Sequence, residues 1–510
     1  MPTKTKLLEK QGIRAAKQLD DIMSGKMKIS DAPGKKTSQA NRKGGGTPTA
    51  DSETELASRY IRLLSFILPG MAYKLSKIDD PRMKKKCTHT LETLMVYGII
   101  AFLANLQSRR AANRDIGGMP AYEALNAVIP ELETMPHADT LARLLARIDV
   151  DKIESYYAEM LEQFIKSDSF RKINPGKLLI AVDGTMKFSM DYRYDNRALR
   201  RHKGGEGKEW YCTYILESVL ILENGAVIPL LTETLENEEG WLDDEKVKQD
   251  CEQKAFRRLA EKLEKLIGKG GATIVLDGIY ASGPVVSLCN FSNWDFMIVL
   301  KNGSMPALWD DFNGLRKCEP DNRLCVQRGK RSQTFHWSNG IEHVYGANNK
   351  ILKLNVVTCN EEWTEANSRK GVGPQRMTTN YAWLSSAKVT IKNAVNLCDT
   401  ARRRWRIENH IKTEKHNGYN YTHCYSYNWN VMKGYHCLMK IAHFINTLIT
   451  FSIAVREYLT AEGIEGFIKK AWRLIIARRS NLCKDNQCDI GDLHNPKRLR
   501  FNFKALKLTS

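Results

Sequence analysis

Two short apolar runs that each end on an aspartate constrain the fold of this chain more than any other feature. Residues 177–182 read Lys-Leu-Leu-Ile-Ala-Val before Asp183, and residues 272–276 read Ala-Thr-Ile-Val-Leu before Asp277. Apolar runs of this length, bounded by polar residues, are typical of strands that are buried on both faces. We therefore expect an α/β fold in which both aspartates lie at the carboxyl ends of buried strands, where ligands tend to bind.

The elements around these runs predict their order along the chain. Residues 211–232 hold two β-rich runs separated by Glu223-Asn224-Gly225, which is a hairpin signal. Residues 247–266 carry an apolar stripe at helical spacing, and a helix over 280–291 precedes a strand over 296–300. The order strand, strand, strand, helix, strand, helix resembles that of the ribonuclease-H-like nucleases, whose mixed sheet places the two aspartate-bearing strands side by side.

The remaining chain divides by composition and by the period of its apolar residues. Residues 51–168 repeat apolar residues three and four apart, as helices do, and residues 303–375 alternate around Asn339-Gly340, as hairpins do. Tyr381–Ser385 is expected to be the last strand of the sheet. The expected segments are a disordered basic leader (1–50), an all-helical domain (51–168), the first part of the α/β core (169–302), a β-rich insertion (303–375), the second part of the core with a carboxylate-bearing helix (376–425), and a helical C-terminal region with a basic tail (426–510).

The excess of basic residues indicates the class of partner. Lys and Arg number 78 against 58 Asp and Glu, which gives a formal net charge of +20. A surplus of this size on a globular protein favours a polyanion, most simply nucleic acid. The start of the chain lacks a secretory signal, and the apolar runs 93–106 and 441–455 are too short to span a bilayer. We therefore expect a cytoplasmic protein without a membrane partner.

The cysteines give no clear sign of a metal site. The chain has 12 of them and no secretory signal, so reduced thiols are expected. Cys483 and Cys488 are followed by His494, but a clear fourth ligand is lacking. The pattern therefore does not favour zinc there.

A third carboxylate, Glu408, joins the two aspartates as a candidate site residue. It lies in a basic helical segment in which Arg404 is four positions before it and Lys415 seven positions after it, so the three side chains share one helix face. Asp183, Asp277 and Glu408 together would form an all-oxygen site for two Mg²⁺ or Mn²⁺ ions, the arrangement that serves phosphodiester chemistry. The two cations would neutralise phosphates of a nucleic acid.

The two apolar neighbours of Glu408 in this segment are expected to lie off that face. Trp405 and Ile407 are both expected to pack against the sheet.

These residues resemble a known family, the DDE transposases of bacterial insertion sequences, in the group of insertion-sequence family four and its relatives. The group is marked by Tyr-x2-Arg-x3-Glu-x6-Lys, which Arg404, Glu408 and Lys415 match, whereas Ala401 stands at the tyrosine position. The segments that begin Asp183-Gly-Thr and Asp277-Gly-Ile-Tyr-Ala-Ser are similar to the family's two aspartate motifs.

The resemblance implies a reaction, a site and a set of partners. The implied reaction is Mg²⁺-dependent cleavage at the inverted-repeat ends of a transposon, followed by transfer of the 3′-hydroxyl ends into target DNA. Asp183, Asp277 and Glu408 would be the catalytic metal ligands, and Arg404 and Lys415 would bind DNA. The implied partners are double-stranded DNA and a second copy of the chain on paired ends, in a bacterial-type, nucleoid-associated setting. The helical domain is expected to hold the transposon ends, and the basic tail from Lys469 to add phosphate contacts.

Two questions stay open at this point. Some relatives stack a flipped base on an aromatic residue of the insertion; Trp309, Trp337 and Trp363 are candidates, but core positions are favoured for all three. The alternative function is that of a catalytically inert, domesticated transposase-derived DNA-binding protein, and Ala401 is the feature that favours it.

Overall fold

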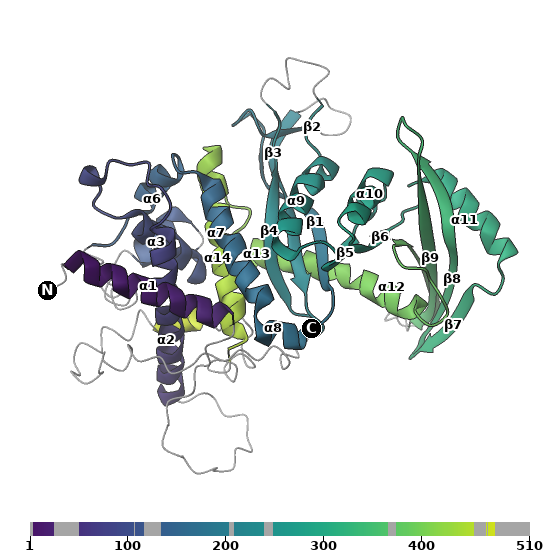
Figure 1. Ribbon diagram of the computed structural model, residues 1–510, viewed down its shortest axis with the longest axis horizontal. Coiled ribbons are helices and arrows are strands. Elements are labelled where there is room, and N and C mark those ends of the chain that lie inside the picture. The colour runs from purple at the N-terminus through teal and green to yellow at the C-terminus, as the bar shows by residue number, and fades with distance from the viewer. Residues whose placement is uncertain are drawn as a thin grey trace, which may run out of the picture.

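The computed structural model describes residues 4–24, 50–106, 108–116, 134–202, 209–238, 248–365, 374–452, 466 and 468–474. A mixed, largely antiparallel sheet of ten strands runs through it, with helices on both faces (Figure 1). The expected α/β class is therefore confirmed.

Five strands form the part of the sheet that bears the two aspartates. Their order is β4 (Val227–Leu235), β3 (Glu209–Ile221), β1 (Leu178–Met190), β5 (Ala272–Leu276) and β6 (Asp295–Val299). The β4–β3 and β3–β1 pairs are antiparallel, and the β1–β5 and β5–β6 pairs are parallel. The strands that carry Asp183 and precede Asp277 are therefore neighbours. The expectation that Asp183 ends its strand is wrong, because β1 stays paired with β3 as far as Met190, although its parallel pairing with β5 stops at Val182. A short strand, β2 (Leu199–His202), pairs with the start of β3 and was not expected from the sequence.

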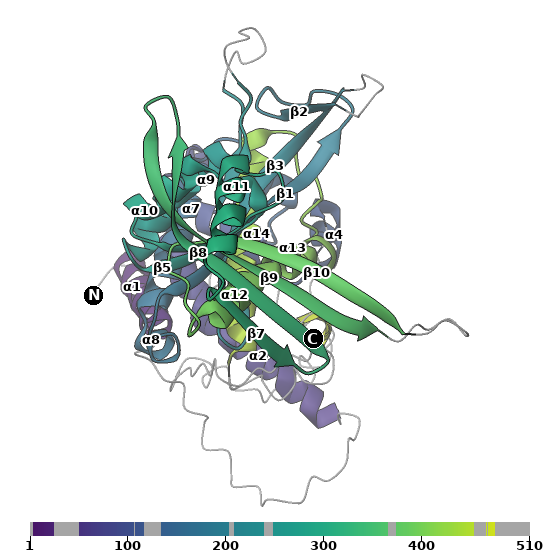
Figure 2. The same ribbon diagram turned by 90° about the vertical axis from the view of Figure 1, so that its right-hand side faces the viewer.

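The sheet continues beyond β6 into the expected β-rich insertion. The strand β10 (Gln375–Ser385) pairs with β6 and is followed across the sheet by β9 (Lys350–Glu365), β8 (Arg331–Tyr345) and β7 (Arg323–Arg328). All of these pairs are antiparallel, and Figure 2 shows the long strands β8, β9 and β10 side by side. The insertion thus extends the central sheet. It also contains a helix, α11 (Pro306–Cys318), which contacts β8 and was not expected.

Successive side chains of β1 point to opposite faces of the sheet, and each face packs into a different apolar core. Ile180 and Val182 belong to the larger apolar core, together with α9 (Glu252–Ile267) and α10 (Gly283–Phe291). Leu179 and Ala181 belong to a second core. That second core is covered by α12 (Ala394–Arg402) and α13 (Arg406–His416), which are joined by a 3-10 turn, η3 (Arg403–Trp405). The single helix expected over 389–415 is therefore divided at this turn.

Every described element between residues 50 and 173 is helical. The elements are α2 (Ala50–Leu75), η1 (Lys84–Lys86), α3 (Leu91–Leu103), α4 (Arg109–Asp115), α6 (Ala138–Leu145), α7 (Val150–Lys166) and α8 (Asp168–Ile173). The long helix α14 (Trp429–Thr450) lies against α3, α6, α7 and β4, so it joins this helical group to the sheet (Figure 1).

The prediction of a disordered leader is wrong for residues 4–24. Lys4–Met23 forms the helix α1, which packs against α2. Leu19, Ile22 and Met23 are spaced three and four apart, so they share one face of the helix, and all three are buried. That apolar face provides the burial that orders the segment in spite of its basic composition.

Several expectations concern parts of the chain outside the described residues. Residues 25–49 of the leader, most of the basic tail after Lys469, and Cys483, Cys488 and His494 all lie outside them. Within the described ranges, none of the helices combines the length and the apolar character that crossing a bilayer requires.

Candidate active site

The register of the sheet places Asp183 and Asp277 next to each other on one face. Val182 pairs with Leu276 across the parallel strands β1 and β5, and each aspartate is the next residue. Ala181 and Val275 both point into the core beneath α12 and α13. Because side chains alternate along a strand, the aspartates two positions further on point to that same face.

Arg404, from the turn between α12 and α13, brings the three predicted acids together. Its guanidinium nitrogens lie 3.7 Å from Asp183 Oδ2, 3.8 Å from Asp277 Oδ1 and 3.0 Å from Glu408 Oε1. The Arg404 side chain is only 8% exposed, whereas that of Glu408 is 54% exposed. Three carboxylates therefore surround one nearly buried cation, beside the middle of β1 and the carboxyl end of β5.

The surroundings shift the pKa values of the two aspartates in opposite directions. Burial raises the pKa of Asp183 to about 6; Asp277 and Glu252 add to the rise, and Arg404 opposes it. Burial would also raise the pKa of Asp277, but hydrogen bonds from Lys301 and from the Gly278 backbone leave it below its ordinary value. Asp183 is thus the acid that most needs a cation beside it.

The glycine after Asp183 is required by packing on the opposite face of the sheet. A Cβ atom on Gly184 would lie 2.6 Å from Cδ of Glu252, the first residue of α9. The Glu252 carboxylate accepts a hydrogen bond of 2.8 Å from the hydroxyl of Tyr280. Glu252 therefore contacts the backbone beside Asp183 from below the sheet, while Asp183 itself faces α13.

Lys301 is a site residue that the sequence analysis missed. Its Nζ donates a hydrogen bond of 2.7 Å to Asp277 Oδ2. Lys301 follows β6, the next parallel strand after β5. A lysine just after the neighbouring parallel strand was the signal that could have found it, because the carboxyl ends of parallel strands meet at one edge of a sheet.

The structure separates the two cations that were expected on the face of Glu408. Arg404 contacts the three acids, but within the described chain no hydrogen bond or ion pair links Lys415 to any of them. Lys415 is half-buried on α13, and burial lowers its pKa, with the negative charge of Glu217 opposing the change. Lys415 therefore lies on the same helix as Glu408 but apart from the three acids around Arg404.

Of the two residues expected to pack against the sheet, one does so and one does not. Ile407 is fully buried in the core beneath α13. The prediction for Trp405 is wrong, since its ring is 55% exposed and lines a cavity beside Asp277. The 3-10 turn changes the angular spacing of the residues just before α13, so helical periodicity misplaces this side chain.

A cavity of about 580 Å³ opens beside Asp277 and runs onto the insertion. Trp309, Trp405, Tyr381 and Trp383 contribute aromatic rings to its lining. Its cationic side chains are those of Lys301, Arg316, Arg402 and Arg404, and the buried Ala401 lines it too. Aromatic faces with cations between them are the surroundings that unstacked nucleotides bind.

The three tryptophans of the insertion have different environments. Trp309 lines the cavity, and its Nε1 donates to the Lys301 carbonyl at 3.1 Å. Trp337 is buried in the core under α12 and α13. Trp363 lies under the guanidinium of Arg331, which is 4.4 Å from the ring centroid. Trp309 is thus the one of the three beside the acids.

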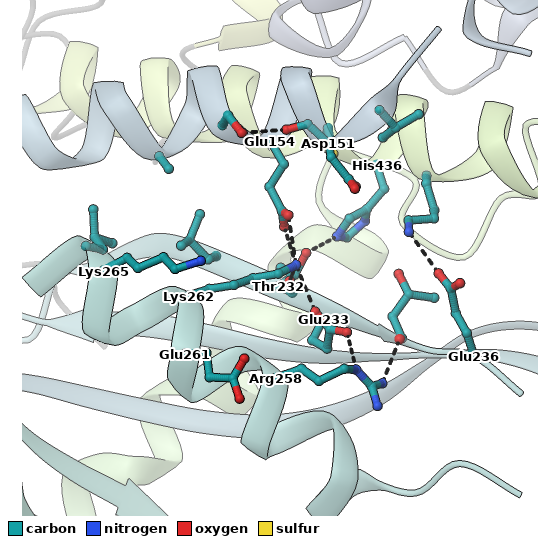
Figure 3. A pocket seen from close by; sticks show the side chains of 18 of the residues that line it. Asp151, Glu154, Thr232, Glu233, Glu236, Arg258, Glu261, Lys262, Lys265 and His436 are labelled. Atoms are coloured by element: carbon teal, nitrogen blue, oxygen red, sulfur yellow. Dashed lines mark hydrogen bonds and ion pairs between the residues drawn. The ribbon is translucent and has the colours of Figure 1, made fainter. Parts of the chain in front are cut away.

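A larger cavity, of about 970 Å³, lies away from the acids between α7, α9, β4 and α14 (Figure 3). Lys262 of α9 reaches Glu154 of α7 and Glu233 of β4, each at 2.8 Å. Arg258 forms further ion pairs with Glu233 and Asp250, both at 2.6 Å. The charged side chains that meet here largely satisfy one another, so this cavity marks the boundary between the helical group and the sheet.

The three acids suit Mg²⁺ or Mn²⁺ by their donor chemistry. They supply only carboxylate oxygens, which these hard ions prefer. Their ligand atoms are spread around Arg404: in the part of the chain that the structure describes, the one group of three His, Cys, Asp or Glu ligand atoms within 4.8 Å of one another is His410, Glu414 and His443. The exposed Glu408 side chain has room to move toward the aspartates.

Two family models match parts of this chain. Residues 249–445 match a family model described as "Transposase DDE domain", and residues 72–160 match one described as "DDE_Tnp_1-associated". No curated protein matches the chain. The first match spans Asp277 and Glu408 and begins after Asp183. The chain thus carries a transposase DDE domain and its associated domain, and these support a DDE transposase.

Proposed function

We propose that this protein is a DNA transposase that cleaves DNA at the inverted-repeat ends of a transposon and transfers the 3′-hydroxyl ends into target DNA. The observation that carries the proposal is the grouping of Asp183, Asp277 and Glu408 around Arg404, where the parallel pairing of β1 and β5 ends. Acids grouped in this way repel one another and lower the stability of the folded state. Such a group therefore marks a functional site. The match to a transposase DDE domain supports the reaction class.

We infer that the core is ribonuclease-H-like. The strand order β4-β3-β1-β5-β6 supports this, since the two outermost pairs on the β4 side are antiparallel and the two pairs that follow are parallel. The strand β10 and the helix α13 then belong to the second part of the core, after the insertion of β7, β8 and β9.

The three acids are the residues that would hold two Mg²⁺ (or Mn²⁺) ions. When bound, such ions activate a water or a 3′-hydroxyl for attack on phosphorus and stabilise the leaving oxygen. Arg404 offsets the negative charges of the acids in the protein alone, and its fork of N–H donors also matches the oxygens of a phosphate. We infer that Arg404 exchanges carboxylate contacts for phosphate contacts when DNA binds.

The lining of the cavity beside Asp277 supports a path for the DNA strand. Lys301 and Arg404 line it together with Asp277 and with the rings of Trp309 and Trp405. We infer that the strand to be cut lies along this surface, with its phosphates against the cations and Lys415 contacting the backbone further along α13.

The remaining parts of the chain are assigned to binding. We infer that the helical region 51–168 holds the transposon ends and that two copies of the chain act on paired ends. Such a reaction takes place on nucleoid DNA in the cytoplasm. Ala401 at the tyrosine position remains the sequence feature that favours the inert alternative, whereas the acids and the cations that balance them, all present around the site, support the active one.

Incubation of the purified protein with linear DNA that bears the native flanks of its gene, with Mg²⁺, tests the proposal. The cuts are mapped at nucleotide resolution for the wild type and for Asp183→Asn, Asp277→Asn and Glu408→Gln. We expect each variant to lose nicking by about 100- to 1,000-fold or more, the scale of losing a group that stabilises transition-state charge. DNA binding in a mobility-shift assay should survive in all three variants.

Asp295→Asn is the matched control. Asp295 begins β6 at the opposite end of the sheet, where it pairs with Lys177, so its loss should leave nicking unchanged. Wild-type nicking rates in any of the three site variants would refute the assignment of that residue.

A further inference from the structure

A second cluster of ligand-type side chains lies on the same helix as Glu408 but inside the protein. His410 and Glu414 are one turn apart on α13, and His443 faces them from α14. Glu414 Oε1 lies 3.3 Å from His410 Nε2 and 2.7 Å from His443 Nδ1. The two imidazole rings are stacked, with centroids 4.7 Å apart and planes within 6° of parallel. Two ring nitrogens therefore lie close to a single carboxylate oxygen, and that of His443 makes a hydrogen bond to it.

Hydrogen bonds within the protein leave this cluster incompletely satisfied. The side chains of His410, Glu414 and His443 are 3%, 0% and 9% exposed, and among the described residues His410 Nε2 is buried without a hydrogen-bond partner. Leaving a buried polar atom unpaired destabilises the folded state.

We propose that His410, Glu414 and His443 form a binding site for a transition-metal ion of the zinc type, which links α13 to α14. Two imidazole nitrogens and one carboxylate oxygen are a donor set that suits zinc and related ions and does not suit Mg²⁺. In a tetrahedral zinc site the ligand atoms stand about 3.3 Å apart. The His410–Glu414 separation already has this value, and the His443–Glu414 separation needs to open by about 0.6 Å. Because the two imidazole rings are nearly parallel, one ring must also turn so that both nitrogens face the same ion.

The charge around the cluster favours one more cation. Glu217 and Glu414 share the single ammonium of Lys440, which lies 2.9 and 2.8 Å from the two oxygens of Glu414 and also binds Glu217. The next cation, Lys187, donates from its Nζ to the carbonyl oxygen of Tyr421 at 2.8 Å. A divalent ion on Oε1 of Glu414 would leave the other oxygen to Lys440, which is how second partners commonly orient a ligating carboxylate.

The site would be structural, and it does not depend on the proposed reaction. Its residues are enclosed between two helices, with the ring of Tyr419 stacked on His443 at a centroid distance of 4.4 Å. Because α13 also carries Glu408, an ion here would hold the catalytic helix against α14.

Metal analysis of the full chain tests the proposal. The protein is stripped with a chelator in mild denaturant, refolded with Zn²⁺ or Co²⁺, dialysed and measured for bound metal. We expect about one ion per chain, a Co²⁺ visible spectrum of the tetrahedral type, and a higher melting temperature with metal than without. The double variant His410→Ala/His443→Ala should lose the ion and the spectrum.

Two further variants separate this site from other sources of metal. His416→Ala removes an exposed histidine of the same helix and should keep the ion. Cys483→Ser/Cys488→Ser should also keep it; loss of the metal in that variant, or its retention in the double histidine variant, would overturn the proposal. If the double variant fails to fold, the wild type decides alone, since refolding without bound metal or without a tetrahedral Co²⁺ spectrum also overturns it.

Discussion

At the scale of single residues, the unusual feature is the cation that the acids surround. Arg404 is nearly buried, and its guanidinium lies within 4 Å of all three carboxylates. A lysine could not replace it easily, because only the planar fork of an arginine presents donors in several directions at once. When no metal ion is bound, the balance of charge in the site therefore depends on Arg404 together with Lys301.

The raised pKa of Asp183 predicts how stability depends on pH in the metal-free protein. The pKa is about 6 in the folded chain against an ordinary value of 3.8. The folded state then holds this proton more tightly than the unfolded state, so the group lowers stability as the pH rises from about 4 to about 6. The full loss, about 3 kcal/mol for about two pKa units, is present above that range.

Asp183→Asn should remove this loss. We expect the free energy of unfolding to rise by up to about 3 kcal/mol at pH 8 and to change little at pH 4, as measured by urea unfolding in chelator. Asp295→Asn serves as the control. An equal gain at both pH values would show that the ionisation of Asp183 is not the cause.

The contact between Lys301 and Asp277 predicts a change in the pH profile of nicking. Lys301→Met removes the ammonium that helps to hold Asp277 ionised, so the acid limb of the rate profile should move to higher pH. We expect single-turnover nicking to fall about 10-fold, the size of losing a charge-assisted contact of about 1.4 kcal/mol. Lys317→Met, which changes an exposed lysine of α11, should behave as the wild type. If Lys301→Met slows nicking without moving the pH profile, Lys301 acts on something other than Asp277.

At the scale of elements, α13 bears a functional face and a buried charged face. Glu408 points toward the aspartates, whereas Glu414 is fully buried against α14. Burial alone would raise the pKa of Glu414, but Lys440 and the two histidines hold it well below its ordinary value. The helix is therefore fixed by charge pairs as well as by the apolar contacts of Ile407 and Ile411.

Loss of the ammonium at this junction should destabilise the protein strongly. Lys440→Met leaves Glu217 and Glu414 without their shared cation in the interior, and removal of one partner of a buried pair costs about 3–5 kcal/mol. Denaturant unfolding measures the change. Lys433→Met is the matched control on the same helix, where the pair with Glu236 is partly exposed and should contribute at most about 1 kcal/mol. Similar losses in the two variants would contradict this account.

At the scale of the whole molecule, the ten-stranded sheet joins parts of the chain that the sequence divides. Figure 1 shows the helical group beside the β4 edge of the sheet and the strands of the insertion at its other edge. The pairs between α7, α9 and β4 connect the helical group to the sheet (Figure 3). The acids lie between the helical group and the insertion. On the proposed function, DNA that the helical group holds would pass the acids and reach the insertion.

The net charge of +20 predicts binding to DNA that depends strongly on salt. We expect Lys415→Ala to weaken binding of all duplexes to a similar degree and to make the slope of log K against log salt about 1 unit less steep. Lys269→Ala, beyond the amino end of β5 and so at the opposite end of the sheet from Asp277, is the control. An unchanged slope in Lys415→Ala would show that Lys415 does not contact a phosphate. Fluorescence anisotropy over a salt series measures the affinity and its slope for each variant.

The elements that the sequence predicted well are those with a strong local signal. The strands before Asp183 and Asp277, the hairpin of β3 and β4, and the helix α9 follow from apolar runs, a turn motif and an amphipathic stripe. The elements that were missed are α1, β2 and α11. The first two are short or basic, and α11 lies in a segment whose alternating runs predicted strands throughout.

The sequence by itself determined that two aspartates directly follow short apolar runs, that a third acid lies four positions after Arg404, and that the chain carries a large positive charge. The first two depend only on residues near one another along the chain, and the third depends on composition alone. The tertiary structure decided that Lys301 binds Asp277, that Trp405 is exposed while Lys415 stands apart from the acids, and that His410 and Glu414 meet His443. These contacts depend on which strands are neighbours and on how α13 lies against α14, and long-range packing sets both.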